Sequence, residues 1–330
     1  MFSKNSIKLV SAAFSLSTWR SYEAAWNSFA AFEIFVRTSY TWPLSQHAVN
    51  EYISWAANTR KLRSASIQSY LASLASIHQL FNHSALSFSS LTTKALLRGC
   101  SNLESMVSNP KPSRKVFSLP LLKILGHEIA QTDWSENSKR VFWTCACTAF
   151  FGSFRIGELL ASKKSSFDPT STLLWGDIVF GEKSCIVHLR SPKCNSKEGD
   201  FVDLFEFKDQ SVCPVSCLKP LSCYSGGNKN SPVFQFSSGN LLTPESFNKS
   251  LRLLLTPHLG NDAQHFSSHS MRAAIPSALA KFPRLANSED IKGWGRWDSA
   301  CYMRYTRLKL DRKRAIFSKI SSALLPQAFL

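Results

Sequence analysis

Side chains that can act on a phosphate group gather in one stretch near the C-terminal end of the chain. His269 and Arg272 lie in His-Ser-Met-Arg, Trp297 ends Gly-Arg-Trp, and Tyr305 ends Tyr-Met-Arg-Tyr. A guanidinium is always charged and presents a rigid fork of donors, which suits phosphate oxygens. A tyrosine oxygen can attack phosphorus, and a positioned histidine can move the proton. These residue types together indicate nucleophilic chemistry at phosphorus.

Another arginine, Arg155, lies far upstream, three residues before Glu158 in Phe-Arg-Ile-Gly-Glu. Taken alone, an arginine and a glutamate at this spacing form an ordinary pair on a helix surface. The order of the motifs is more informative than any one of them. Arg155 follows an apolar helix, a polar hairpin with Lys193 at its tip comes next, and the histidine, arginine, tryptophan and tyrosine follow. This order predicts one composite site.

The elements that must position these residues are helices and a small sheet. Segments rich in apolar, β-branched and aromatic residues predict strands, and the polar segment 192–199 predicts a hairpin tip. The expected strands cover 173–180, 185–191 and 201–207. Apolar periodicity predicts helices as well, one of which leads straight into Arg155. These helices cover 120–130 and 141–154, and others begin at Cys213, Thr243 and about Ser267.

The first hundred residues predict a separate bundle of four amphipathic helices, because apolar residues recur there every three or four positions. The helices begin at Ser15 and after a capping Ser45, and continue over 67–81 and 90–107. Their aromatic residues are expected to face the core. Residues 1–12 carry no strong pattern and are expected to form a loose lead-in.

A linker is predicted at 108–115, where two prolines and three positive charges replace the apolar pattern. The chain is therefore divided into a helical domain, residues 1–110, and a second domain, residues 111–330. The expected fold class is mainly α with a small antiparallel β-sheet (α+β).

The net charge predicts a polyanionic partner. Lysine and arginine outnumber aspartate and glutamate by 39 to 22, giving +17. Nucleic acid is favoured over an acidic membrane surface. Eight basic residues in the first domain and the linker are candidates for contacts with phosphates. They are Arg60, Lys61, Arg63, Lys94, Arg98, Lys111, Arg114 and Lys115.

Several other classes are disfavoured by the sequence. The longest apolar run, from Val141 to Phe154, has about 14 residues, whereas a bilayer span needs about 20. The N-terminus does not resemble a secretory signal, so the protein is not expected to be secreted. Nine cysteines are scattered without metal-ligand spacing. The spacing of Cys213, Cys217 and Cys223 also favours ordinary thiols over a zinc site. No cofactor or metal is expected.

In order and wording, the motifs resemble the catalytic domain of tyrosine recombinases, the lambda-integrase family, over roughly residues 113–310. His-Ser-Met-Arg and Gly-Arg-Trp-Asp-Ser-x-x-Tyr-x-x-Tyr are most similar to recombinases of eukaryotic mobile elements, the Crypton and DIRS-like groups. The resemblance implies a helical core-binding domain that clamps DNA, followed by a catalytic domain with a C-terminal tail helix.

The resemblance also implies a role for each site residue. Arg155 and Arg272 would hold the phosphate, Glu158 would brace Arg155, and His269 and Trp297 would assist. Lys193 would protonate the leaving 5′-oxygen, although Lys197 in the same hairpin tip is a rival. Tyr305 would be the nucleophile, with Tyr302 one helical turn before it as the alternative.

The implied activity is site-specific recombination of double-stranded DNA through a 3′-phosphotyrosyl intermediate and a Holliday junction, without metal or ATP. The family implies a homo-tetramer on paired sites, integration or excision of a mobile element, and a nuclear location in a eukaryote or a cytoplasmic one otherwise. Two readings compete: a type IB topoisomerase, which would relax DNA as a monomer, and a DNA-binding protein whose catalysis has decayed.

Overall fold

The computed structural model describes residues 3–81, 83–107, 115–190, 199–224, 227–280 and 287–296. The chain divides into two compact units, Met1–Lys111 and Pro112–Leu330. The boundary proposed from the linker lies one residue earlier. Each unit has its own hydrophobic core, as expected for domains.

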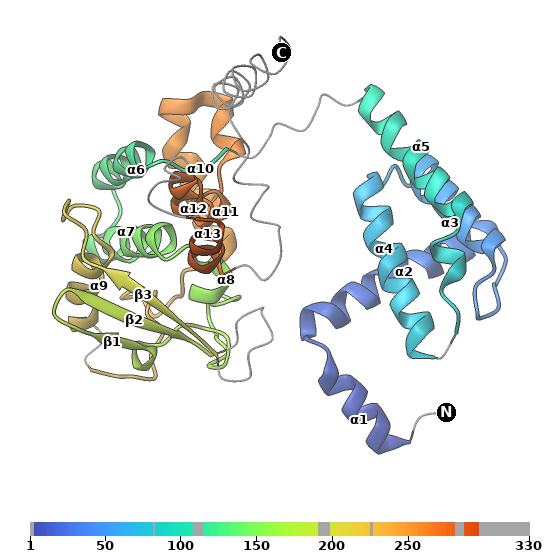
Figure 1. Ribbon diagram of the computed structural model, residues 1–330, viewed down its shortest axis with the longest axis horizontal. Helices are drawn as coiled ribbons and strands as arrows, with labels where there is room; N and C mark the ends of the chain where they lie inside the picture. The colour runs from blue at the N-terminus through green and yellow to red at the C-terminus, as the bar shows by residue number, and fades with distance from the viewer. Residues whose placement is uncertain are drawn as a thin grey trace, which may run out of the picture. The chain divides into compact units, whose positions relative to one another are not determined.

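The first unit is helical (Figure 1). Its α-helices are α1 (Lys4–Ala13), α2 (Leu16–Val36), α3 (Gln46–Asn58), α4 (Ser64–Leu80) and α5 (Leu91–Val107). Ser45 caps α3 as predicted, accepting from the backbone N–H of Ala48, and Ser15 caps α2 in the same way by accepting from that of Thr18. The prediction of a loose lead-in is wrong, because Ser3 caps α1 in the same way. No residue of α1 is buried, which explains why the sequence has no apolar stripe that would predict this helix.

The core of the first unit contains aromatic as well as aliphatic side chains, but the predicted aromatic stripe on α2 is only partly correct. Phe29 and Phe32 are buried against Tyr52 of α3. Trp26 is 44% exposed and stacks on Trp42 with the ring centroids 5.2 Å apart. The buried face of α2 runs through Ala25, so Trp26, one position further round the helix, points away from it.

The second unit combines helices with a three-stranded sheet, which confirms the predicted fold class (Figure 1). Its α-helices are α6 (Leu119–Gln131), α7 (Glu136–Phe151), α8 (Ile156–Leu159), α9 (Pro214–Cys223), α10 (Pro244–Leu259), α11 (Ser268–Arg272), α12 (Ala274–Leu279) and α13 (Ser288–Gly295). Its strands are β1 (Ile178–Phe180), β2 (Ser184–Leu189) and β3 (Asp200–Phe205). The sheet is antiparallel in the order β1-β2-β3.

One face of the sheet belongs to the core. Cys185, Val187 and Leu189 of β2 are buried, whereas Ile186 between them is exposed, as the two-residue period of a strand requires. α9 packs against both α7 and β3 (Figure 1). The first expected strand is shorter than predicted, because the segment Trp175–Asp177 forms a 3-10 helix whose Asp177 carboxylate accepts from the backbone N–H of Leu174.

The central helix α7 is buried along its C-terminal half and ends at Phe151, not at residue 154 as predicted. The chain then turns through Gly152 and Ser153, and Ser153 has a positive φ of 48°. A non-glycine residue in this region costs about 1 kcal/mol. Phe154 is still fully buried, so its hydrophobicity extended the apolar run beyond the helix. Because of this turn, Arg155 lies outside α7 and stands at the start of the next helix, α8.

Candidate active site

Arg155 and Glu158 form the first part of the site at the start of α8. Arg155 is the N-cap residue, and its backbone N–H donates to Glu158 Oε2 at 2.8 Å. The Arg155 guanidinium donates through Nη1 to Glu158 Oε1, also at 2.8 Å. One carboxylate therefore caps the helix and fixes the arginine side chain, which is the bracing role predicted for Glu158.

Arg272, the last residue of α11, reaches the same carboxylate. Its side chain is 3% exposed, and its Nη1 lies 3.9 Å from Glu158 Oε2. Nη1 also donates to the carbonyl oxygen of Ser153 at 2.7 Å, and Nη2 to that of Gly295 at 2.6 Å. The two arginines, more than a hundred residues apart in sequence, thus converge on one point of the fold.

His269 lies on α11 three residues before Arg272, a spacing that brings two side chains to the same side of a helix. It is half-buried. The start of this helix is held by α10, because the backbone N–H of Ser268 donates to Oδ1 of Asn248 at 2.8 Å. The helices α11, α12 and α13 contact one another in sequence order, and α11 and α12 also pack against α7 (Figure 1).

Arg296 is a member of the cluster that the sequence analysis missed. Its Nη2 lies 2.9 Å from Glu158 Oε2 and 3.3 Å from the carbonyl oxygen of Ser153, and its Nη1 lies 3.5 Å from Oδ2 of Asp200. The guanidinium carbon lies 5.0 Å from the centre of the Phe154 ring. In the sequence, Arg296 is the middle residue of Gly-Arg-Trp, immediately before Trp297.

Glu158 stays ionised at the centre of this cluster. Burial alone would raise its pKa, but the charge of Arg296 and the hydrogen bonds from Arg155 outweigh burial, so the pKa of Glu158 is below its usual range. The carboxylate offsets part of the repulsion among three guanidinium groups that lie close together. The site therefore concentrates positive charge, as binding of a phosphate requires.

Three predicted catalytic residues, Lys193, Trp297 and Tyr305, lie outside the described residues, and so do their rivals Lys197 and Tyr302. Their roles stay predictions. The chain around them is nevertheless tied to the site. Asp200, at the start of β3, is paired with Arg296, and Arg296 immediately precedes Trp297.

Six of the eight candidates for DNA contact can be located. Arg60, Lys61, Arg63, Lys94 and Arg98 are exposed on the first unit, whereas Lys111 and Arg114 lie outside the described residues. Arg60 lies over the ring of Trp55 at 5.9 Å. Lys115, in the second unit, pairs with Asp262 at 2.5 Å. Lys115 is exposed as well, but its existing partner makes it a weaker candidate than the five residues of the first unit.

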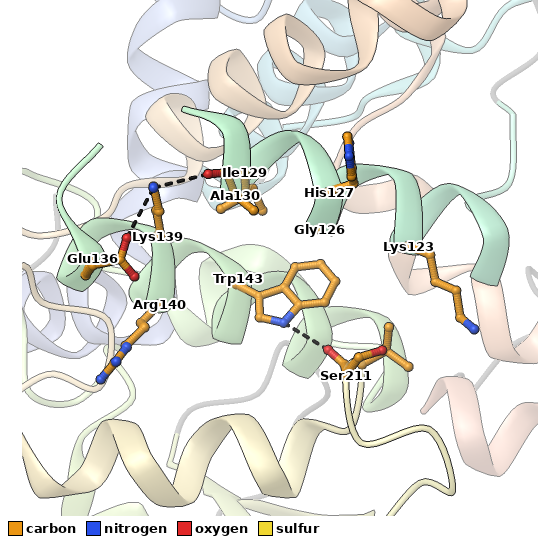
Figure 2. A pocket seen from close by; sticks show the side chains of 11 residues that line it. Lys123, Gly126, His127, Ile129, Ala130, Glu136, Lys139, Arg140, Trp143 and Ser211 are labelled. Carbon is orange, nitrogen blue, oxygen red and sulfur yellow. Dashed lines mark hydrogen bonds and ion pairs between the residues drawn. The ribbon is translucent and has the colours of Figure 1, made fainter. Parts of the chain in front are cut away.

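A pocket of about 440 Å³ between α6 and α7 was not anticipated (Figure 2). The Trp143 ring forms part of its wall beside Gly126, and the Trp143 indole N–H donates to the carbonyl oxygen of Ser211 at 3.2 Å. Its cations already have partners: Lys123 pairs with Asp209, Lys139 with Glu136, and Arg140 donates to the Tyr224 hydroxyl. None of the predicted catalytic residues lines it.

The described residues show neither a metal site nor a membrane-spanning helix. They contain no group of three or more His, Cys, Asp or Glu side chains arranged to hold a metal. Cys213 is instead buried and caps α9, its sulfur accepting from the backbone N–H of Ser216. No helix in this part of the chain is long and apolar enough to cross a bilayer.

No protein-family model matches the sequence, and no curated protein matches it either. Solved structures do match in fold. XerH site-specific recombinase bound to palindromic difH substrate has a TM-score of 0.58 at 14% identity, covering 88% of this chain and 78% of the other. Tn1549 transposon integrase with transposon right end DNA has a TM-score of 0.57 at 12% identity, covering 86% and 88%.

A lambda integrase dimer bound to a COC′ core site also matches, with a TM-score of 0.52 at 11% identity, covering 90% of this chain and 73% of the other. At such identities the likeness concerns the fold alone. The chain has the fold of tyrosine recombinases, in agreement with the fold class expected from the motifs.

Proposed function

We propose that the protein is a site-specific DNA recombinase that cleaves and rejoins strands through a 3′-phosphotyrosyl intermediate. The observation that carries this proposal is the convergence of Arg155 and Arg272 on the two oxygens of Glu158. Two arginines held at one point can bind the nonbridging oxygens of a single phosphodiester and stabilise the charge that builds there. Loss of one such interaction commonly costs a hundredfold or more in rate, about 3 kcal/mol.

In the proposed reaction, the Tyr305 hydroxyl attacks the scissile phosphate and becomes bonded to phosphorus as the 5′-oxygen leaves. His269 assists removal of the tyrosine proton, and Trp297 donates to a phosphate oxygen. Lys193 protonates the departing 5′-oxygen. The phosphotyrosine conserves the energy of the broken bond, so attack by a 5′-hydroxyl from another strand restores the backbone without ATP.

Double-stranded DNA is the proposed partner. XerH, Tn1549 integrase and lambda integrase are each described in complex with DNA. The net charge of +17 and the exposed basic residues of the first unit are consistent with a phosphate backbone. We further propose that the first unit, Met1–Lys111, clamps DNA and that four copies assemble on paired sites. The reaction would move a mobile element, in the nucleus of a eukaryotic host or the cytoplasm otherwise.

The nucleophile can be tested with a duplex that carries a nick near the cleavage point. Release of the short fragment beyond the nick prevents religation and should trap an SDS-resistant adduct of protein and DNA. Tyr305→Phe should abolish the adduct, because it removes only the attacking oxygen, and should leave DNA binding unchanged. An adduct that survives in Tyr305→Phe but disappears in Tyr302→Phe would assign the role to Tyr302.

Recombination can be separated from simple relaxation by comparing two reactions of the wild-type protein. Two labelled duplexes that carry the target should give branched junctions that contain strands from both. Rapid relaxation of a supercoiled plasmid without such junctions would contradict recombination and indicate a topoisomerase. Binding without adduct, junction or relaxation would indicate decayed catalysis.

A further inference from the structure

Arg296 joins segments that lie far apart in the sequence. Through its two terminal nitrogens it contacts Glu158, which braces Arg155, and Asp200, the first residue of β3. Arg296 itself ends α13 as its C-cap residue. One side chain therefore connects the segment of the first arginine, the base of the β2–β3 hairpin and the end of α13.

The base of this hairpin is tightly built, so a tie at Asp200 holds the whole base. Asp200 is paired with Leu189 in the strand register. The preceding residue, Gly199, has a φ of 82°, and a Cβ there would lie 2.6 Å from the carbonyl oxygen of Leu189. Only glycine fits between the two strands at this point. Asp200 therefore cannot move without moving the end of β2.

The two ion pairs of Arg296 differ: the contact with Glu158 is a hydrogen-bonded pair at 2.9 Å, whereas Asp200 lies 3.5 Å away and interacts through charge. The Arg296 side chain is 11% exposed, and its backbone is left-handed with a φ of 51° and a ψ of 58°. Glycine is the residue that adopts this C-cap conformation most easily. A buried guanidinium is stable only when it is paired. Since its partners belong to two separate segments, all of its contacts form in only one relative arrangement of those segments.

We propose that Arg296 is a positioning residue for strand cleavage. It fixes the hairpin base and the Glu158 brace relative to the end of α13. The inference rests on the proposed function, in which the hairpin tip carries Lys193 and the chain beyond α13 carries Trp297 and Tyr305. Arg296 acts through these groups, so its loss affects the rate of cleavage more than the affinity for DNA.

The first test measures adduct formation and affinity on the same nicked duplex for Arg296→Gly, Arg296→Lys and Asp200→Asn. Arg296→Gly should slow adduct formation by about tenfold to a hundredfold, because small misplacements of reacting groups are costly. The affinity for DNA should stay within about twofold in the same variant, because Arg296 is paired with Glu158 and Asp200 and is not proposed to contact a phosphate. Arg296→Lys should recover part of the rate, because lysine keeps the charge but not the fork.

A second test does not depend on cleavage. It measures how firmly Arg296 holds the hairpin base, by hydrogen exchange of the backbone amides in β2 and β3. Exchange should be faster in Arg296→Gly and in Asp200→Asn than in the wild type. The double variant should exchange no faster than Arg296→Gly, because both changes remove the same ion pair between Arg296 and Asp200. Arg37→Gly is the matched control. Arg37 also caps a helix in the left-handed conformation, with a φ of 54°, but it is exposed and in the first unit.

These two tests separate the inference from the function on which it rests. Wild-type protein that forms no adduct contradicts the proposed function, while hydrogen exchange still decides whether Arg296 holds the hairpin. Wild-type rates and exchange in Arg296→Gly would overturn the inference, and so would an equal loss of rate and affinity. If Arg296→Gly does not fold, Asp200→Asn decides in the same way, and wild-type behaviour in that variant overturns the proposal.

Discussion

At the scale of single residues, the site is organised around one negative charge. The Glu158 carboxylate pairs with Arg155 at 2.8 Å and with Arg296 at 2.9 Å, and Arg272 lies 3.9 Å away. Its side chain is 8% exposed, so solvent screens these charges less than it would at the surface. Without the carboxylate, three guanidinium groups would lie close together with no shared anion between them. Glu158 therefore supports both the stability of the fold and the geometry of the site.

Replacing Glu158 with glutamine should destabilise the protein in a pH-dependent way. At neutral pH the free energy of unfolding should fall by about 3 kcal/mol, because buried charges lose their partner. The folded-state pKa of Glu158 lies below its ordinary value of 4.5, so its contribution is complete above that value and is lost as the pH falls through the folded pKa. Urea unfolding at several pH values should show the variant and the wild type converging in acid.

Glu136→Gln provides the control for this comparison. Glu136 also pairs with a cation, Lys139, at 3.2 Å, but its side chain is 74% exposed. Exposed pairs of this kind contribute little to stability. The control should unfold like the wild type at every pH. If Glu158→Gln behaves in the same way as this control, the buried carboxylate does not hold the arginines together.

At the scale of elements, the position of α7 depends on a close approach to α6. A Cβ added to Gly126 of α6 would lie 2.8 Å from Cη2 of the Trp143 ring on α7 (Figure 2). The ring cannot simply swing aside, because its indole N–H donates to the carbonyl oxygen of Ser211. Since α7 leads into the turn that presents Arg155, this contact helps to set the first arginine in place.

Gly126→Ala should therefore destabilise the second unit despite the higher helix propensity of alanine. The expected loss is about 1–3 kcal/mol, the usual cost of overpacking a core. Gly99→Ala on α5 is the matched change, because no atom lies within 4 Å of an added Cβ there. It should stabilise the first unit by about 0.5–1 kcal/mol. Thermal unfolding of both variants checks the prediction, and an equal gain in both would show that α6 and α7 separate freely.

At the scale of the whole molecule, positive charge is distributed over two compact units. Arg60, Lys61 and Arg63 are exposed together on the first unit, in the connection between α3 and α4. The second unit carries the arginine cluster of the site. A protein that contacts DNA through both units should lose affinity steeply as salt concentration rises, because each phosphate contact releases counterions.

The contribution of the first unit can be measured by replacing Arg60, Lys61 and Arg63 together with glutamine. Each lost phosphate contact should flatten the slope of log K against log salt concentration by about 0.9. Lys219→Gln is the control, because its ammonium donates to the carbonyl oxygen of Glu182 in the second unit, and it should leave the slope unchanged. A wild-type slope in the triple variant would exclude this connection from the DNA contact.

The sequence alone predicted the start of most helices, and both ends of two of the three strands, to within one to three residues. Capping serines and apolar periods act locally, so Ser45, Ser90 and the apolar positions of α6 predicted their elements well. The extra helix α1 was missed, and α7 begins five residues earlier and ends three residues earlier than predicted. Each departed from the pattern for a physical reason, α1 because it buries nothing and α7 because Phe154 is buried beyond its end.

The same division holds for the site. Residue type and order along the chain made Arg155, Glu158, His269 and Arg272 candidates, because few side-chain types suit a phosphate. Only the tertiary structure decided that both arginines meet at Glu158 and that Arg296 joins them there. Such contacts depend on where the turn at Ser153, the start of β3 and the end of α13 meet in space. Spacing along a chain carries no information about that distance, which is fixed by the packing of a common core.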